Sequence, residues 1–111
     1  MKFFDTSIKV QHACPFCDLS AAFPEARMAT WCNRENEVLQ IVVPEHSQLN
    51  DVLGAAREAL GIRAVVRAGQ CVLTMTRDCT CNRYRSVASL ADESGCWLLS
   101  PTTYYGGWET H

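Results

Sequence analysis

A chain of 111 residues, 48% of them hydrophobic and 20% charged, can bury one hydrophobic core without disulfide bonds and is too short for two. The formal net charge of -2 argues against direct nucleic-acid binding, which requires a basic face. No stretch approaches the ~18 apolar residues of a membrane-spanning helix, and the start lacks the apolar segment of a signal peptide. We therefore expect one cytoplasmic domain that contacts neither a membrane nor nucleic acid.

The first part of the chain predicts a strand, a short helix and a hairpin. Apolar and polar residues alternate along residues 4–11, as they do in a half-buried strand. Pro15 suits the first position of a helix, and Pro24 ends the helical spacing of apolar residues that follows. Two β-rich segments, residues 27–32 and 37–43, flank a polar connection and therefore predict the hairpin.

A longer helix and further strands are predicted next. Apolar residues recur at helical spacing across residues 49–60, with Ser47 placed as the N-cap and Gly61 as the C-terminal cap. The β-rich segments 62–67 and 71–76 that follow form either one bulged strand or a second hairpin.

The last third of the chain has a different pattern. A polar loop contains Cys79 and Cys81, and the segment 86–92 has weak helical character. Residues 96–100 predict a short strand, and the aromatic residues and glycines of 101–107 predict an extended tail.

These elements together predict an α+β fold. Residues 1–77 follow the order βαββαβ, which is typical of ferredoxin-like and ACT-like domains with an antiparallel sheet and both helices on one face. We expect residues 78–111 to form a cysteine-containing extension packed on the same domain.

The strongest chemical motif is Cys14-Pro15-Phe16-Cys17. The chain has seven cysteines, which cannot all pair within one molecule, and in a reducing compartment this indicates metal or redox chemistry. Thiols at the start of a helix are also favoured as thiolates by the peptide dipoles. A pair of ordinary half-buried cysteines is the alternative interpretation.

The cysteine spacing extends this motif to a larger candidate site. Cys32 follows Cys17 after the same interval as Cys96 follows Cys81. Thiolates with an added imidazole suit Zn(II), which is the expected ion; an iron-sulfur cluster or a thiophilic ion such as As(III) would also suit. The candidate metal ligands are Cys14, Cys17, Cys32, Cys79, Cys81 and His12.

Each of the less central residues has a competing structural interpretation. Cys32 is equally suited to the core, and Cys79 and Cys81 can belong to a solvated loop. We expect Cys71 and Cys96 in the core. We expect the other two histidines, His46 and His111, to lie on the surface.

Two alternative functions remain open. A strand followed by C-P-F-C and a helix looks like the active site of glutaredoxins, with Cys14 as nucleophile and Cys17 as resolving thiol. The early Pro24 and the hairpin that follows argue against that fold, so we expect no enzyme activity. A dimerisation or interaction module with incidental cysteines is the other alternative.

A family resemblance bears on these alternatives. The segments Cys14-Pro15-Phe16-Cys17-Asp18-Leu19-Ser20, Trp31-Cys32-Asn33 and Val38-Leu39-Gln40-Ile41 resemble the amino-terminal region of archaeal regulators of the bacterio-opsin-activator type. The ending Tyr105-Gly106-Gly107-Trp108-Glu109 is similar to the segment that leads into their helix-turn-helix domain.

The resemblance implies a cysteine-based metal-binding or redox-sensing domain of a transcription regulator. It also implies a homodimer that contacts DNA only through a helix-turn-helix domain, which these residues do not contain, because no segment after Arg77 has two helical patterns joined by a short turn.

Overall fold

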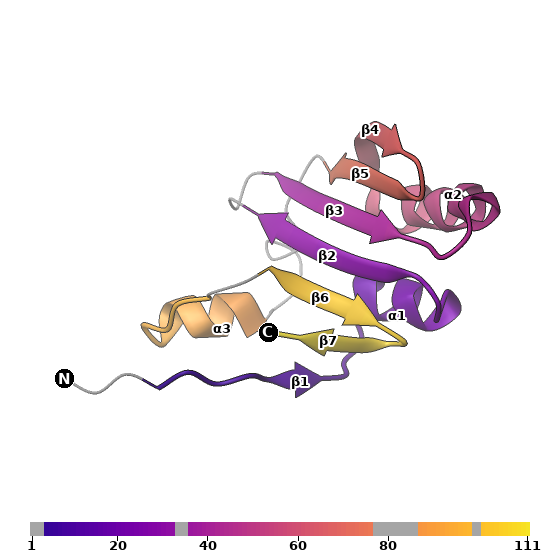
Figure 1. Ribbon diagram of the computed structural model, residues 1–111. Coiled ribbons are helices and arrows are strands. Elements are labelled where there is room, and N and C mark those ends of the chain that lie inside the picture. The colour runs from indigo at the N-terminus through magenta and orange to yellow at the C-terminus, as the bar shows by residue number, and fades with distance from the viewer. Residues whose placement is uncertain (1–3, 33–35, 77–86, 99–100) are drawn as a thin grey trace.

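The computed structural model describes residues 4–32, 36–76, 87–98 and 101–111, which form a mixed α/β structure (Figure 1). Across these residues, every helix is too short or too polar to cross a membrane. In chain order the elements are β1 (Lys9–Val10), α1 (Pro15–Ala22), β2 (Arg27–Cys32), β3 (Glu37–Val42), the 3-10 helix η1 (His46–Gln48), α2 (Leu49–Leu60), β4 (Ile62–Ala68), β5 (Cys71–Thr76), α3 (Val87–Glu93), β6 (Thr102–Tyr105) and β7 (Trp108–Thr110).

The described strands form one antiparallel sheet in the order β1-β7-β6-β2-β3-β5-β4. The two ends of the chain meet in this sheet, because β1 pairs with β7 and Val10 lies opposite Glu109. The backbone groups of Ile8 and His111 exchange two further hydrogen bonds, of 3.0 and 2.8 Å. β6 then joins this pair of strands to β2 (Figure 1).

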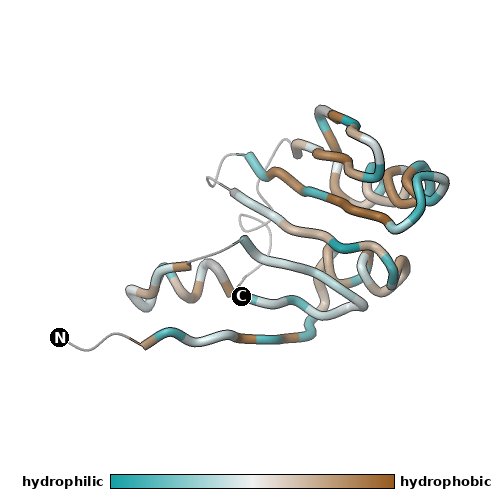
Figure 2. Tube along the Cα trace, in the orientation of Figure 1, coloured by the Kyte–Doolittle hydropathy of each residue, from teal (hydrophilic) through white to brown (hydrophobic). Residues whose placement is uncertain are grey.

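One face of the sheet is covered by α1 and α2. Tyr104, Met28, Ile41 and Val72 are successive cross-strand partners on β6, β2, β3 and β5, and all four are buried. α1 packs against β6, β7 and α2, while α2 packs against β5. Figure 2 shows a long hydrophobic stretch along β3, whereas β6 and β7 are more polar. The α1 end of the core is therefore its more polar end.

The opposite face of the sheet, here called the open face, carries exposed apolar and aromatic side chains. Its cationic side chains lie over two of the rings: the Lys9 Nζ atom is 5.0 Å from the Trp108 ring, and the Arg27 guanidinium is 5.2 Å from the Tyr105 ring. The exposed apolar and aromatic residues of this face are Trp31, Val42, Val66, Leu73, Met75, Tyr105 and Trp108.

Several predicted elements are confirmed. The helix that begins at Pro15 ends at Ala22, before Pro24, and the first hairpin is formed by β2 and β3. Gly61 caps α2 in the left-handed conformation, with a φ of 65°. The open choice after α2 is resolved as a second hairpin, β4 and β5, with a register shift between Ile62 and Ala64.

Other details of the prediction are wrong. Ser47 is not an N-cap, because residues 46–48 form the 3-10 turn η1 and the helix α2 follows it directly. Of the strand predicted over residues 4–11, only Lys9 and Val10 pair as strand β1. Residues 96–98 are not a strand. The last strands are β6, within the segment predicted as an extended tail, and β7, which follows that segment.

The physical reason for the last error is a two-residue turn. Tyr105 pairs with Trp108, and the two residues between them, Gly106 and Gly107, have φ values of 58° and 86°. Two successive positive φ angles are typical of a tight hairpin turn that matches the twist of its strands. The end of the chain is therefore a hairpin built into the sheet, and the specific ferredoxin-like or ACT-like arrangement is not confirmed.

The turn between β6 and β7 also contacts α1 closely. The backbone N–H of Gly107 donates a hydrogen bond of 3.0 Å to Ser20 Oγ, which itself donates to the carbonyl of Cys17. A Cβ atom at position 107 would lie 3.2 Å from the Cβ of Ala21. Only glycine therefore fits between the turn and the helix without displacement.

We expect Gly107→Ala to destabilise the protein more than Gly106→Ala. Both substitutions force alanine into a positive φ, at a cost of roughly 1–2 kcal/mol, but only position 107 also crowds α1. Urea unfolding, followed by circular dichroism, measures both free energies of unfolding. Equal losses in the two variants would show that the contact with α1 does not constrain the turn.

Candidate metal centre

Four side chains from distant parts of the chain meet at the N-terminal end of α1. His12, Cys14, Cys17 and Glu109 each offer one ligand atom, and these four atoms all lie within 4.8 Å of one another. Three of the four residues are buried, whereas the His12 side chain is 32% exposed. The group is therefore enclosed by protein on most sides and reaches solvent at His12.

The start of α1 places the two thiols together. Cys14 is the N-cap of the helix, in extended conformation, and its Sγ accepts a hydrogen bond of 3.3 Å from the backbone N–H of Cys17. Pro15 occupies the first turn, where its missing N–H leaves no unsatisfied donor. Because residues three apart lie on the same side of a helix, the Cys17 thiol also faces the group.

Strand β7 brings Glu109 to the same place. Trp108 and Thr110 face the other side of the sheet, so the alternation of the strand directs Glu109 towards α1. Glu109 pairs with Val10 of β1, and His12 follows Val10 by two residues in the sequence. The Gly107 contact with α1 fixes the distance between the helix and this strand.

The Glu109 carboxylate is buried but well partnered. Its Oε2 atom lies 3.1 Å from His12 Nε2 and 2.9 Å from His111 Nε2, and His111 Nδ1 lies 3.2 Å from Thr102 Oγ1. Burial alone would raise the pKa of Glu109, but the hydrogen bonds from His111, His12 and Tyr104 outweigh it, so the net pKa is lowered. Glu109 is therefore an anion beside the two thiols.

The pKa of the Cys14 thiol is shifted in the opposite direction, upwards. Burial, with smaller contributions from the neighbouring Cys17 and the Glu109 charge, raises the pKa of Cys14 to about 12. Burial and the Glu109 charge raise the pKa of Tyr104 as well. A bound cation would reverse this preference at Cys14, because a coordinating thiol loses its proton to the metal.

The donor set and its spacing fit a tetrahedral metal ion. Two sulfurs, one imidazole nitrogen and one carboxylate oxygen are all ligands that Zn(II) accepts. Bond lengths of ~2.0–2.3 Å to a tetrahedral ion place ligand atoms ~3.3–3.8 Å apart. The observed group, within 4.8 Å, would need only small side-chain rotations to reach this geometry.

The structure brings together three of the predicted ligands, namely His12, Cys14 and Cys17. Cys79 and Cys81 lie outside the described residues. Cys32 ends β2, and its side chain is likewise outside the description.

The fourth member of the group, Glu109, was not predicted as a ligand. The signal that identifies it is the Gly-Gly turn before it, which predicts a hairpin and hence a buried face for the strand that follows. Its partner His111, predicted on the surface, has a side chain only 5% exposed, whereas His46 is exposed as predicted.

The cysteines predicted in the core are more accessible than expected. Cys71 is partly buried at the start of β5, and Cys96 is exposed. Both are free thiols, and neither belongs to the group at α1. They are therefore matched controls for experiments on Cys14 and Cys17.

We expect Glu109→Gln to destabilise the metal-free protein at neutral pH, by about 1–3 kcal/mol, because the charged hydrogen bonds to both histidines are lost. A carboxylate whose pKa is lowered on folding stabilises the protein above its ordinary pKa of 4.5, and this contribution disappears as the pH falls towards the folded-state pKa. The difference between the two proteins should shrink below that pH. Denaturant unfolding across the pH range measures it, and a constant difference would contradict the assignment.

A comparison with known proteins places the chain in a family. A search of the curated proteins and a search of the solved structures found no match. A family described as HVO_A0563, N-terminal, matches residues 5–111, which include all four residues of the group at α1. Because this match spans nearly the whole sequence, the chain belongs to the HVO_A0563 N-terminal family.

Proposed function

We propose that this chain is a metal-binding regulatory domain that holds Zn(II) through Cys14, Cys17, His12 and Glu109. The observation that carries the proposal is the convergence of these four donors within 4.8 Å, from residues that are up to 97 positions apart in the sequence. Convergence over such a separation requires the folded sheet, which distinguishes the group from cysteines that are merely adjacent in a loop.

The donor set also selects among the candidate ions. Two thiolates, a nitrogen and an oxygen suit a borderline ion such as Zn(II). Iron-sulfur clusters are usually held by four thiolates, and As(III) prefers three sulfurs, whereas the group within the described residues contains two. When bound, the ion would supply positive charge beside Glu109 and would link α1 to the strand pair β1–β7.

Such a link suits a sensor better than a catalyst. The ligands come from the segment after β1, from α1 and from β7, so occupation of the site would stabilise the contact between the two ends of the chain. The regulatory role itself is supported by the resemblance to archaeal bacterio-opsin-activator-type regulators. The matched family is described as N-terminal, which agrees with a domain whose DNA reader is a separate helix-turn-helix domain.

Two further parts of this proposal remain predictions. A homodimer is expected for such a regulator, and the open face, with its exposed Trp31 and Leu73, offers an apolar surface for association. The cytoplasm is the expected compartment, since thiol ligands must stay reduced to hold an ion.

The glutaredoxin-like alternative finds less support in the geometry. A nucleophilic cysteine needs a lowered pKa and an accessible sulfur. Cys14 is 7% exposed, and burial raises the pKa of its thiol to about 12. These properties favour a ligand that is deprotonated by its metal, so we propose that the chain is not an enzyme.

We expect the reduced protein to bind one equivalent of Zn(II), with an increase in thermal stability. Cys14→Ser and Cys17→Ser should each weaken binding by more than about 100-fold, because each removes a direct ligand. Anaerobic titration against a chromophoric chelator measures the affinity, and calorimetry measures the stabilisation.

The matched controls for this experiment are Cys71→Ser and Cys96→Ser, which should bind Zn(II) like the native protein. Two results would refute the metal proposal: binding below about a tenth of an equivalent with no stabilisation on adding Zn(II), or equal affinity in all four variants. The second result would support an interaction module with incidental cysteines.

We expect Cys14 of the metal-free protein to react with iodoacetamide more slowly at pH 7 than Cys96. The reason is that a buried thiol with a pKa of about 12 is almost entirely protonated at this pH, whereas Cys96 is exposed. Mass spectrometry of the alkylated peptides gives both rates. Faster alkylation of Cys14, together with disulfide reduction that Cys14→Ser abolishes, would instead support the oxidoreductase.

A further inference from the structure

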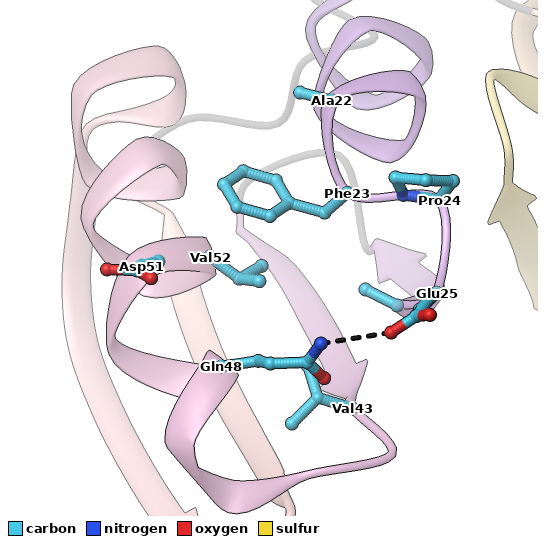
Figure 3. Close-up of a pocket in the computed structure, with 9 residues that line it drawn as sticks. Ala22, Phe23, Pro24, Glu25, Val43, Gln48, Asp51 and Val52 are labelled. Atoms are coloured by element: carbon cyan, nitrogen blue, oxygen red, sulfur yellow. Dashed lines mark hydrogen bonds between the residues drawn. The ribbon is translucent and has the colours of Figure 1, made fainter.

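A second concave site lies at the other end of α1. An open cavity of about 290 Å3 lies between the C-terminal end of α1, the segment that leads into β2, and the first turn of α2 (Figure 3). Its volume is near the lower end of the range for small-molecule pockets, ~300–1,000 Å3. It shares no lining residue with the group at the N-terminal end of α1.

The walls of the cavity are apolar and held by the core. Val43 and Val52 are 2% and 1% exposed, so their positions are set by packing and do not depend on a ligand. Phe23 is partly buried against the same core, and its ring points into the space between α1 and α2 (Figure 3). Because Val43 and Val52 are so little exposed, they form the floor of the cavity, and an apolar group of a ligand would contact mainly the Phe23 ring.

The polar part of the cavity carries negative charge only. Its lining includes the acidic residues Glu25 and Asp51 and no Lys, Arg or His residue, and the Glu25 carboxylate lies on the cavity side (Figure 3). Glu25 Oε2 accepts a hydrogen bond of 2.9 Å from Gln48 Nε2, a neutral amide that fixes the carboxylate without neutralising it (Figure 3). Within the described part of the chain, neither carboxylate forms an ion pair.

The Gln48 side chain is itself held in place, which makes the position of Glu25 less variable. Gln48 Oε1 accepts a hydrogen bond of 3.4 Å from the backbone N–H of Glu45, as part of a capping box at η1. The amide therefore bridges η1 and the segment before β2. This bridge presents the Glu25 carboxylate beside the apolar walls, where a complementary ligand would place a cationic group.

We propose that this cavity binds a small organic cation, with an ammonium or amidinium group against Glu25 and an apolar body against the Phe23 ring. Two features together define this class: an apolar wall excludes strongly hydrated inorganic ions, and unneutralised carboxylates disfavour anions and offer neutral molecules no charge to pair with. The proposal is independent of metal binding at Cys14 and Cys17.

Benzamidine and the neutral, similarly shaped benzamide are suitable probes. Isothermal titration calorimetry at low salt should show that the native protein binds benzamidinium about fivefold or more tighter than benzamide, because only the cation pairs with Glu25. Glu25→Gln keeps the size of the side chain and one hydrogen-bond-accepting oxygen but removes the charge. It should therefore abolish the preference for benzamidinium over benzamide. Glu58→Gln is the control, since Glu58 is an exposed acidic residue of α2 that does not line the cavity.

A variant in the apolar wall tests the second half of the proposal. Phe23→Ala should weaken the binding of both probes, and circular dichroism should establish that it remains folded. Equal affinity for the two probes, an unchanged preference in Glu25→Gln, or no detectable binding of benzamidine by the native protein would overturn the proposal. Repeating the titration with Cys14→Ser separates this result from the metal proposal, because that variant should bind benzamidine normally.

Discussion

A carboxylate that is almost completely removed from water needs hydrogen-bonding or charged partners, and Glu109 obtains them from both ends of the chain. His12 follows the first strand, while Tyr104 and His111 belong to the last hairpin and the residue after it. Leaving such a group unpaired would cost several kcal/mol. The pairing of β1 with β7, and the seating of Gly107 against α1, are therefore coupled to the position of one buried charge.

The same charge changes the chemistry expected at the start of a helix. Peptide dipoles at a helix N-terminus favour a thiolate, and the backbone N–H of Cys17 does donate to the Cys14 sulfur. Burial, Cys17 and the Glu109 anion act against this and raise the pKa of Cys14. A neutral thiol beside a carboxylate is a poor nucleophile, but the two become good ligands once a cation replaces the proton. The site is therefore better suited to ion binding than to thiol exchange.

The short helix α1 has a different chemical environment at each end. Its N-terminal turn carries the thiols and meets the polar strands β6 and β7. The residues after its C-terminal end, which include Glu25, form a cavity with the first turn of α2. At about 1.5 Å per residue, its eight residues separate the two sites by roughly 12 Å. Leu19 and Phe23 pack in one core with α2. This packing holds α1 in place between the two sites.

Local sequence patterns determined much of the fold. The spacing of apolar residues in α2, the start of α1 at Pro15, the cap at Gly61 and the first hairpin all follow from interactions between residues close in sequence. The C-P-F-C motif likewise identified two of the four donors. The position of Glu109 and the edge location of β1 were decided only by tertiary structure, because they depend on pairing between strands about 100 residues apart. Such pairing is selected by sheet register and by packing on α1, which no local window of sequence contains.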